Sequence, residues 1–330
     1  MTDTIPGGVD FTALSKMPLT FELCEKIMSA IQAGIYRGAT FNSFEPFHEA
    51  ARQVKQNGQF MVTEIQYGTK YMNSYLDITY PNADTSVKRP TVFFAHGGGC
   101  FAGSKTVGDP MAAGDNANAL FEDIVSAGYN FVNVDYVLAP EGHFPDPLVQ
   151  LTEAIDFCAA HAEEYGLDMS NVVIFGSSAG AVLTGQYGAL ISSQEYRERL
   201  GIVPRISADS IKCLVIDDAP FRTENFNWKL KVITAYYLGT VDFADEKLAY
   251  NAYDYFNTSM PPCFFDAGPM DGFPEEMRAC GEKMSTLGVE NEVYIPKAEL
   301  PHGFLNLVHT EPEAAECVRR IIAFMDKHTK

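Results

Sequence analysis

The chain has 330 residues, 46% of them hydrophobic and 20% charged, which is enough for one α/β domain with a covering subdomain and a sizeable core. Its 24 basic and 43 acidic residues give a formal net charge of −19, which argues against nucleic acids and anionic membranes as partners. No apolar run approaches the ~20 residues of a membrane span, and residues 1–10 lack the basic and apolar regions of a signal peptide.

Seven cysteines are scattered along the chain without a CxxC pair, so neither a zinc site nor a redox motif is indicated. Their number is odd, and several lie inside apolar runs, which fits a reducing compartment better than an oxidising one. We therefore expect a cytoplasmic protein without a bound metal.

The first predicted elements are helical and form an N-terminal cap segment, residues 1–58. Its apolar repeat at four-residue spacing, typical of an amphipathic helix, consists of Leu23, Ile27 and Ile31. Gly34 and Gly38 are expected to end this helix. A weaker helical stretch is predicted over residues 44–56.

From residue 59 onward, short strands alternate with amphipathic helices, which is typical of a mostly parallel sheet with helices on both faces. Residues 60–67 and 72–80 alternate apolar and polar side chains, as half-buried antiparallel strands do. Six near-continuous apolar runs fit parallel strands buried on both faces, at 92–95, 131–134, 172–175, 211–216, 263–265 and 293–295. The predicted sheet has about eight strands, and ligands bind such sheets at the carboxyl ends of the strands.

One segment, residues 219–258, interrupts this alternation and is rich in aromatic side chains. It is too long for a plain connecting loop. We predict a helical lid, inserted into the main domain of residues 59–330, that packs with the N-terminal segment over the carboxyl edge of the sheet.

Residues 176–180 read Gly-Ser-Ser-Ala-Gly, a G-x-S-x-G pattern between a predicted strand and a predicted helix. A sharp strand-to-helix turn holds a serine clear of the backbone, and glycines are needed where that turn crowds its flanks. The helix that follows directs its N-terminal N–H groups and its dipole at the site. The pattern alone is common, but its position between strand and helix predicts Ser178 as a nucleophile.

A glycine-rich turn, His-Gly-Gly-Gly at residues 96–99, follows the strand at 92–95. Successive glycines let the backbone approach a substrate closely and point its N–H groups inward. Because a nucleophile is predicted downstream, we expect the amides of Gly98, Gly99 and Ala179 to form an oxyanion hole, although a flexible turn is the alternative. His96 is expected to anchor the loop through its ring.

A general base is expected after the serine, and three histidines follow it in the chain. His302 lies in a loop between the strand at 293–295 and the last helix, where its imidazole can reach the serine. His309 would lie in the last helix or its cap, and His328 lies in the tail. The sequence therefore predicts His302 as the base.

The acid that orients the base is predicted to be Asp271, in the loop after the strand at 263–265. Asp266 lies within that strand and could be a buried structural carboxylate. Glu275 and Glu276 are expected to begin the next helix, where acidic residues are favoured. The acid would accept the imidazole N–H, fix its tautomer and stabilise the imidazolium.

These motifs together resemble the branch of α/β-hydrolases that is related to hormone-sensitive lipase and includes bacterial esterases and acetyl esterases. The likeness covers roughly residues 92–304 and includes HGGG, GSSAG, the run DYVLAPE at 135–141, which is followed by Phe144-Pro145, and His302-Gly303-Phe304. Three positions depart from the family pattern: Ser177 stands where Asp is usual, Val137 where a basic residue is usual, and Asp271-Gly272-Phe273 where Asp-Pro-Leu is usual. The resemblance implies the α/β-hydrolase fold under a helical cap and cofactor-free hydrolysis of short-chain acyl esters.

The sequence thus predicts a serine carboxylic ester hydrolase, similar to carboxylesterases and acetyl esterases, that works through an acyl-enzyme. Phe101, Phe221 and Trp228 are expected in the substrate pocket, although most aromatic side chains of the lid would simply form its core. An amidase or formamidase could use the same triad, and a non-catalytic binding protein of this fold would typically have lost a triad residue. The expected partner is a small-molecule ester, and a homodimer is the commonest assembly.

Overall fold

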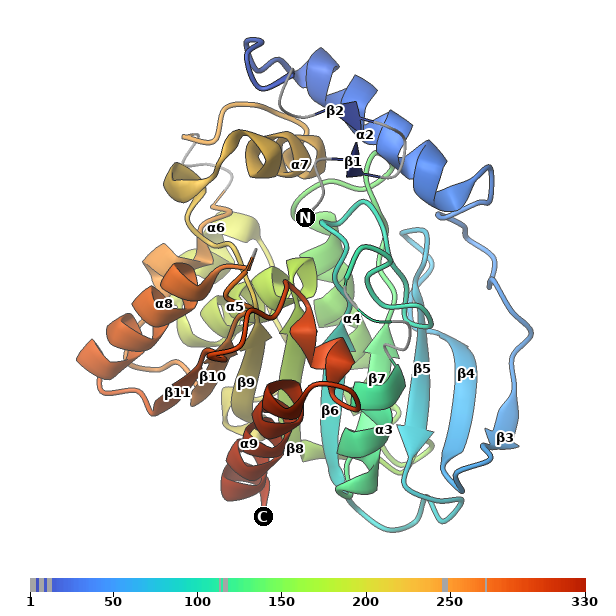
Figure 1. Cartoon of the computed structure of the whole chain (residues 1–330). Helices are drawn as coiled ribbons and strands as arrows, with labels where there is room; N and C mark the ends of the chain where they lie inside the picture. Colours follow the sequence, from blue (N-terminus) through green and yellow to red (C-terminus); the bar gives the residue numbers. More distant parts are fainter. Residues whose placement is uncertain are drawn as a thin grey trace.

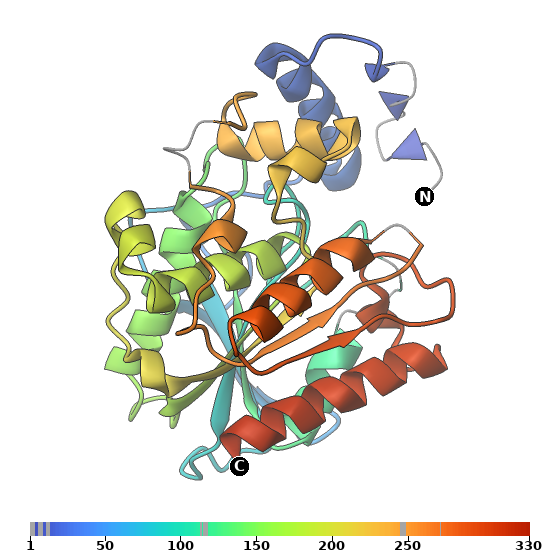
Figure 2. The same cartoon turned by 90° about the vertical axis from the view of Figure 1, so that its left-hand side faces the viewer.

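A nine-stranded sheet runs through the computed structural model, and helices cover both of its faces (Figures 1 and 2). The structure describes residues 4–5, 9–10, 14–112, 114, 118–244, 249–270 and 272–330. The strands of the large sheet are β3 (Arg52–Val54), β4 (Phe60–Gln66), β5 (Tyr75–Tyr80), β6 (Pro90–Ala95), β7 (Asn130–Val134), β8 (Asp168–Ser177), β9 (Ile211–Asp217), β10 (Cys263–Asp266) and β11 (Asn291–Tyr294). A separate two-stranded sheet pairs β1 (Thr4–Ile5) with β2 (Val9–Asp10).

The strand order is β11-β10-β9-β8-β6-β7-β5-β4-β3. The pairs from β11 to β7 are parallel, whereas β3, β4 and β5 pair antiparallel. All eight strands predicted from the sequence are present, and the ninth, β3, lies inside the stretch 44–56 that was predicted to be helical. That prediction is wrong because this stretch has no apolar face to bury: the three residues of β3 are exposed and pair only with β4 at the sheet edge.

The helices are α2 (Phe21–Tyr36), α3 (Asn118–Ser126), α4 (Asp146–Ala160), α5 (Ala179–Ser192), α6 (Gln194–Leu200), α7 (Trp228–Leu238), α8 (Pro274–Thr286) and α9 (Pro312–Thr329). Short 3-10 turns are η1 (Ala208–Ser210), η2 (Thr223–Asn225), η3 (Ala252–Tyr255) and η4 (Phe304–Leu307). Side chains of α4, α5 and α8 bury one face of the sheet, and those of α3 and α9 bury the other. None of the helices in the described part of the chain is long and apolar enough to cross a bilayer.

The N-terminal helix α2 packs against α7, so that two segments far apart in the sequence lie side by side beyond the carboxyl ends of the parallel strands (Figure 1). Ile27 and Ile31, from the predicted four-residue repeat, are buried in this contact. Gln32 at its centre donates to the carbonyl oxygens of Phe101 and Ala139, which belong to the main domain, and accepts a hydrogen bond from Tyr236 of α7. Helix α2 continues past Gly34 and ends where Arg37 adopts the left-handed conformation.

Candidate active site

Ser178 stands at the sharp turn between β8 and α5, with φ 54° and ψ −115°. A positive φ is strained for a residue with a side chain, and the surrounding structure has to enforce it. The flanking glycines are needed because a Cβ on Gly176 would lie 2.0 Å from the Gly180 carbonyl oxygen, and one on Gly180 would lie 1.9 Å from that of Ala95. The predicted strand–serine–helix turn is therefore formed, and it projects the Ser178 hydroxyl beyond the sheet.

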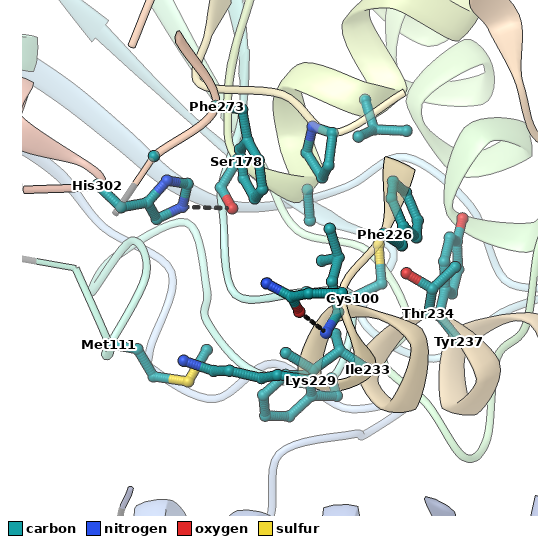
Figure 3. Close-up of a pocket in the computed structure, with 18 of the residues that line it drawn as sticks. Cys100, Met111, Ser178, Phe226, Lys229, Ile233, Thr234, Tyr237, Phe273 and His302 are labelled. Carbon is teal, nitrogen blue, oxygen red and sulfur yellow. Dashed lines mark hydrogen bonds between the residues drawn. The ribbon is translucent and has the colours of Figure 1, made fainter. Parts of the chain in front are cut away.

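His302 contacts that hydroxyl, with Nε2 at 2.9 Å from Ser178 Oγ (Figure 3). Its loop follows β11, so the imidazole reaches the serine from the carboxyl edge of the same sheet. The Phe273 ring packs edge-on against the imidazole at 5.5 Å between centroids. The structure thus brings together the two residues that the sequence predicted as nucleophile and base.

The carboxylate beside the imidazole is Asp218, whose Oδ2 lies 2.9 Å from His302 Nδ1. Asp218 directly follows β9, is fully buried, and also accepts the backbone N–H groups of Gly268 and Phe273 at 3.1 and 2.6 Å. The predicted acid, Asp271, lies outside the described residues. Sequence reasoning missed Asp218 because it searched only the loop after β10; the signal was an acidic residue immediately after the apolar run 211–216, at the same edge of the sheet.

The glycine turn at 96–99 lies beside the serine. Gly98 and Gly99 have φ values of 103° and 60°, and a Cβ on Gly98 would lie 2.1 Å from the Ala102 carbonyl oxygen. Gly99 and Ala179 line the cavity that contains Ser178, whereas Gly98 does not line it. The Gly98 carbonyl oxygen accepts the N–H groups of Phe101 and Ala102, and its own N–H donates to the Asp109 carboxylate.

His96 holds the start of this turn. Its ring is buried, stacks on Tyr136 at 4.2 Å between centroids, and its Nδ1 lies 2.7 Å from the Gly97 carbonyl oxygen. Burial lowers the pKa of His96 to about 4, so the ring is neutral near pH 7. This placement fits the structural role expected for it.

A buried cluster of charges lies next to His96, whose Nε2 is 3.8 Å from Asp135 Oδ1. The Nζ of Lys105 lies 2.5 Å from Glu64 and 3.2 Å from Asp77, and its backbone N–H donates to Asp135 at 2.5 Å. Lys105 therefore supplies a buried cation next to the run 135–141, in which the related family usually carries a basic residue at the position of Val137.

A cavity of about 710 Å³ opens in front of Ser178 and His302. Helix α7 forms one wall, and the side chains that it directs into the cavity recur at helical spacing: Leu230, Ile233, Thr234 and Tyr237. Val182, Phe226 and Cys100 add further apolar surface (Figure 3). This helical periodicity within the segment 219–258 was a usable sequence signal that the search for aromatic residues overlooked.

Of the three predicted pocket residues, Phe101 lines the cavity, but Phe221 and Trp228 do not. Phe221 is fully buried beneath α5, with its ring 5.6 Å from that of Phe256. Trp228 begins α7 and packs with the α2–α7 cluster. Both predictions are wrong because the side chains pack elsewhere: Phe221 enters the main core against α5, and Trp228 packs against the contact between α2 and α7.

Negative charge surrounds His302. Burial alone lowers the pKa of this imidazole, but the charge and hydrogen bond of Asp218, together with the charges of Asp109 and Asp217, outweigh burial and raise the pKa to about 9. In the free protein, therefore, most imidazole rings are protonated at pH 7. No group of three His, Cys, Asp or Glu residues suited to a metal ion occurs in the described part of the chain.

The raised pKa predicts an alkaline activity profile. A protonated His302 cannot accept the Ser178 proton, so kcat/KM is expected to rise roughly tenfold per pH unit below about 9 and to level off above it. Initial rates of ester cleavage between pH 5.5 and 10, corrected for spontaneous hydrolysis, measure this, with circular dichroism as the control for folding. A plateau that already begins at pH 6.5 would contradict the assignment.

The elbow serine, the imidazole and the buried carboxylate, arranged at the carboxyl edge of a mostly parallel sheet under a helical cap, define an esterase-type hydrolase of the α/β-hydrolase fold. The chain belongs to the BD-FAE family, whose model matches residues 76–268, more than half of its length.

Curated relatives and solved structures agree with this placement. The chain is 26% identical over 246 residues to the carboxylesterase NlhH of Mycobacterium tuberculosis, covering 72% of this chain and 73% of that protein. It is 25% identical over 255 residues to the esterase LipI of the same organism, covering 73% of each. The fold is similar to that of esterase B from Lactobacillus rhamnosis, with a TM-score of 0.69, 18% identity, and coverage of 96% of this chain and 95% of that one. A bacterial brefeldin A esterase gives a TM-score of 0.68, 18% identity, and coverage of 95% and 88%.

Proposed function

We propose that the protein hydrolyses short-chain acyl esters through an acyl-enzyme formed on Ser178. The observation that carries this proposal is the continuous chain of contacts from the Ser178 hydroxyl through His302 to Asp218, with 2.9 Å at each step. Serine hydroxyls are weak nucleophiles until an adjacent base accepts their proton, and this geometry supplies that base together with a group that orients it.

The reaction has two halves. His302 Nε2 takes the proton as Ser178 Oγ attacks the ester carbonyl, and the imidazolium then gives that proton to the leaving alcohol. Water enters, loses a proton to the same nitrogen, and releases the acid from the serine. Asp218 accepts a hydrogen bond from the Nδ1–H group of His302 throughout and remains ionised, so the nitrogen that faces the serine is the one free to act as base.

The oxyanion of each tetrahedral intermediate needs hydrogen-bond donors close to Ser178. Gly99 and Ala179 line the same cavity as Ser178, and their backbone N–H groups are the proposed donors, with that of Gly98 as the third predicted one. The N-terminus of α5 begins at Ala179 and adds its dipole to the stabilisation of the negative charge. One such donor is commonly worth about 3 kcal/mol in the transition state.

The acyl group would occupy the apolar part of the cavity between Val182, Phe226 and α7. We expect the large side chains of Phe226 and Tyr237 to limit the length of the acyl chain on this side of the cavity. We propose that α2 and α7 together act as the lid over this space, since they pack on each other and α7 forms the cavity wall.

A chain-length series tests the acyl preference. On 4-nitrophenyl esters from acetate to decanoate, kcat/KM is expected to be highest at four carbons or fewer. Phe226→Ala shortens a cavity side chain and is expected to raise the hexanoate-to-butyrate ratio of kcat/KM about tenfold, in the range that one or two methylenes are worth in an apolar pocket. Phe44→Ala, in an exposed loop away from the cavity, is the matched control. Equal rates from acetate to decanoate in the wild-type protein would refute the short-chain preference.

A further inference from the structure

A row of polar side chains lies directly behind the site, at the ends of three neighbouring parallel strands. Ser177 of β8 is in register with Asp217 of β9, which is in register with Asp266 of β10. The two carboxyl groups are at most 1% exposed. Ser177 Oγ donates to Asp217 Oδ2 at 2.5 Å, which satisfies one of the four carboxyl oxygens.

Backbone carbonyl groups of this row hold the backbone of two catalytic residues, Ser178 and Asp218. The N–H of Ser178 donates to the Asp217 carbonyl oxygen at 2.7 Å, and the N–H of Asp218 donates to the Asp266 carbonyl oxygen at 2.8 Å. A displacement of Asp217 and Asp266 would therefore also displace the backbone of the nucleophile and of its acid.

Three carboxyl oxygens of the row lack a donor. Asp217 Oδ1 and both oxygens of Asp266 are buried and accept no hydrogen bond from an N–H or hydroxyl group of the described residues, whereas the two carboxyl groups lie within hydrogen-bonding range of each other. Buried carboxylates on adjacent strands repel each other, and one proton held between them removes the repulsion and also supplies the missing donor. Burial and the charge of Asp217 raise the pKa of Asp266 well above its usual range, whereas burial and the charge of Asp218 raise that of Asp217 only to about 6.

We propose that Asp266 carries a proton at neutral pH and donates it in a hydrogen bond to Asp217, and that this acid pair positions Ser178 and Asp218 and sets the charge behind His302. Asp266 and Asp217 are then positioning residues, since neither touches the substrate. The ionisable groups that face the pair are Asp218 and His302 on the side of the site and Cys317 on α9. Cys317 is fully buried, and burial raises the pKa of its thiol, so it stays neutral.

The pH profile of kcat/KM distinguishes this charge distribution from a merely structural role. Asp217→Asn removes the negative charge behind His302 and is expected to lower the midpoint of the acid limb by about one unit. Asp266→Asn keeps a donor and changes no charge, so its midpoint is expected to stay within about 0.2 units of the wild-type value. A midpoint that falls equally in both variants would show that Asp266 is ionised and would overturn the proposal.

This kinetic readout rests on the proposed esterase function, so a second measurement is independent of it. In the wild-type protein at pH 7, infrared spectroscopy is expected to show the C=O stretch of a buried carboxylic acid. Burial raises the pKa of Asp135 to about 7, so this group contributes to the same region and the comparison is made by difference. The difference spectrum between the wild-type protein and Asp266→Asn is expected to contain the band, and the difference between the wild-type protein and Asp209→Asn, a change at an exposed carboxylate, is expected to lack it. A difference spectrum for Asp266→Asn without the band would overturn the proposal, whereas failure to hydrolyse esters with the band present would refute only the proposed function.

Discussion

Replacing Ser178 with alanine is expected to reduce kcat for 4-nitrophenyl acetate and butyrate by about 10⁴- to 10⁶-fold, the loss typical for the nucleophile of a serine hydrolase. The change removes one oxygen from a residue whose backbone already holds a strained positive φ, and alanine fits the same turn. Folding should therefore be preserved, and the loss should fall on kcat because the cavity itself is unchanged.

Covalent labelling provides the control for this experiment. A fluorophosphonate probe is expected to modify the wild-type protein and the exposed-site variant Ser170→Ala, but not Ser178→Ala. Undiminished hydrolysis by Ser178→Ala would exclude the serine mechanism. Labelling of the wild-type protein without turnover of any ester would instead indicate that the cavity selects another class of substrate.

Asp218→Asn is expected to lower kcat by about 10³- to 10⁴-fold, since an amide can offer its N–H to His302 and favour the wrong tautomer of the imidazole. The side chain keeps its size, and its oxygen can still accept the backbone N–H of Gly268 or Phe273. The loss should therefore reflect the base rather than unfolding, which thermal melting can verify.

The matched comparison is Asp271→Asn, which changes the acid that the sequence alone predicted. If Asp218 orients the imidazole, its variant should show by far the larger loss of kcat. The acid limb of the pH profile should also move to lower pH in Asp218→Asn, because the main charge that raises the pKa of His302 is gone. A larger loss of kcat in Asp271→Asn than in Asp218→Asn would indicate that Asp271 is the acid.

Ser178 and His302 could be predicted from the sequence because each depends on a local pattern. A glycine-flanked serine between strand and helix, and a histidine after the last strand, are restricted by their immediate neighbours. The acid depends instead on which neighbouring strand end points at the imidazole. Strands β9 and β10 both end in aspartates at the same edge, and residue order alone cannot choose between their loops.

The same contrast between local patterns and contacts of distant segments applies to the strands. Strands with continuous apolar runs were predicted because burial on both faces requires them. Strand β3 was missed since its three exposed residues carry no such pattern and are held by pairing with β4. Phe221 and Trp228 were misplaced for a related reason: an aromatic residue near the site can pack into a core or line the cavity, and only the tertiary packing of its segment decides which.

The cluster around Lys105 places three buried carboxylates against one ammonium group, and one of the carboxylates, Asp135, also lies 3.8 Å from the ring of His96. Substituting that lysine alone would leave like charges facing one another with nothing to balance them. Changes at Lys105, Glu64, Asp77 and Asp135 are therefore interdependent. A homologue that loses Lys105 is therefore expected to carry neutral residues at several of the other three positions as well.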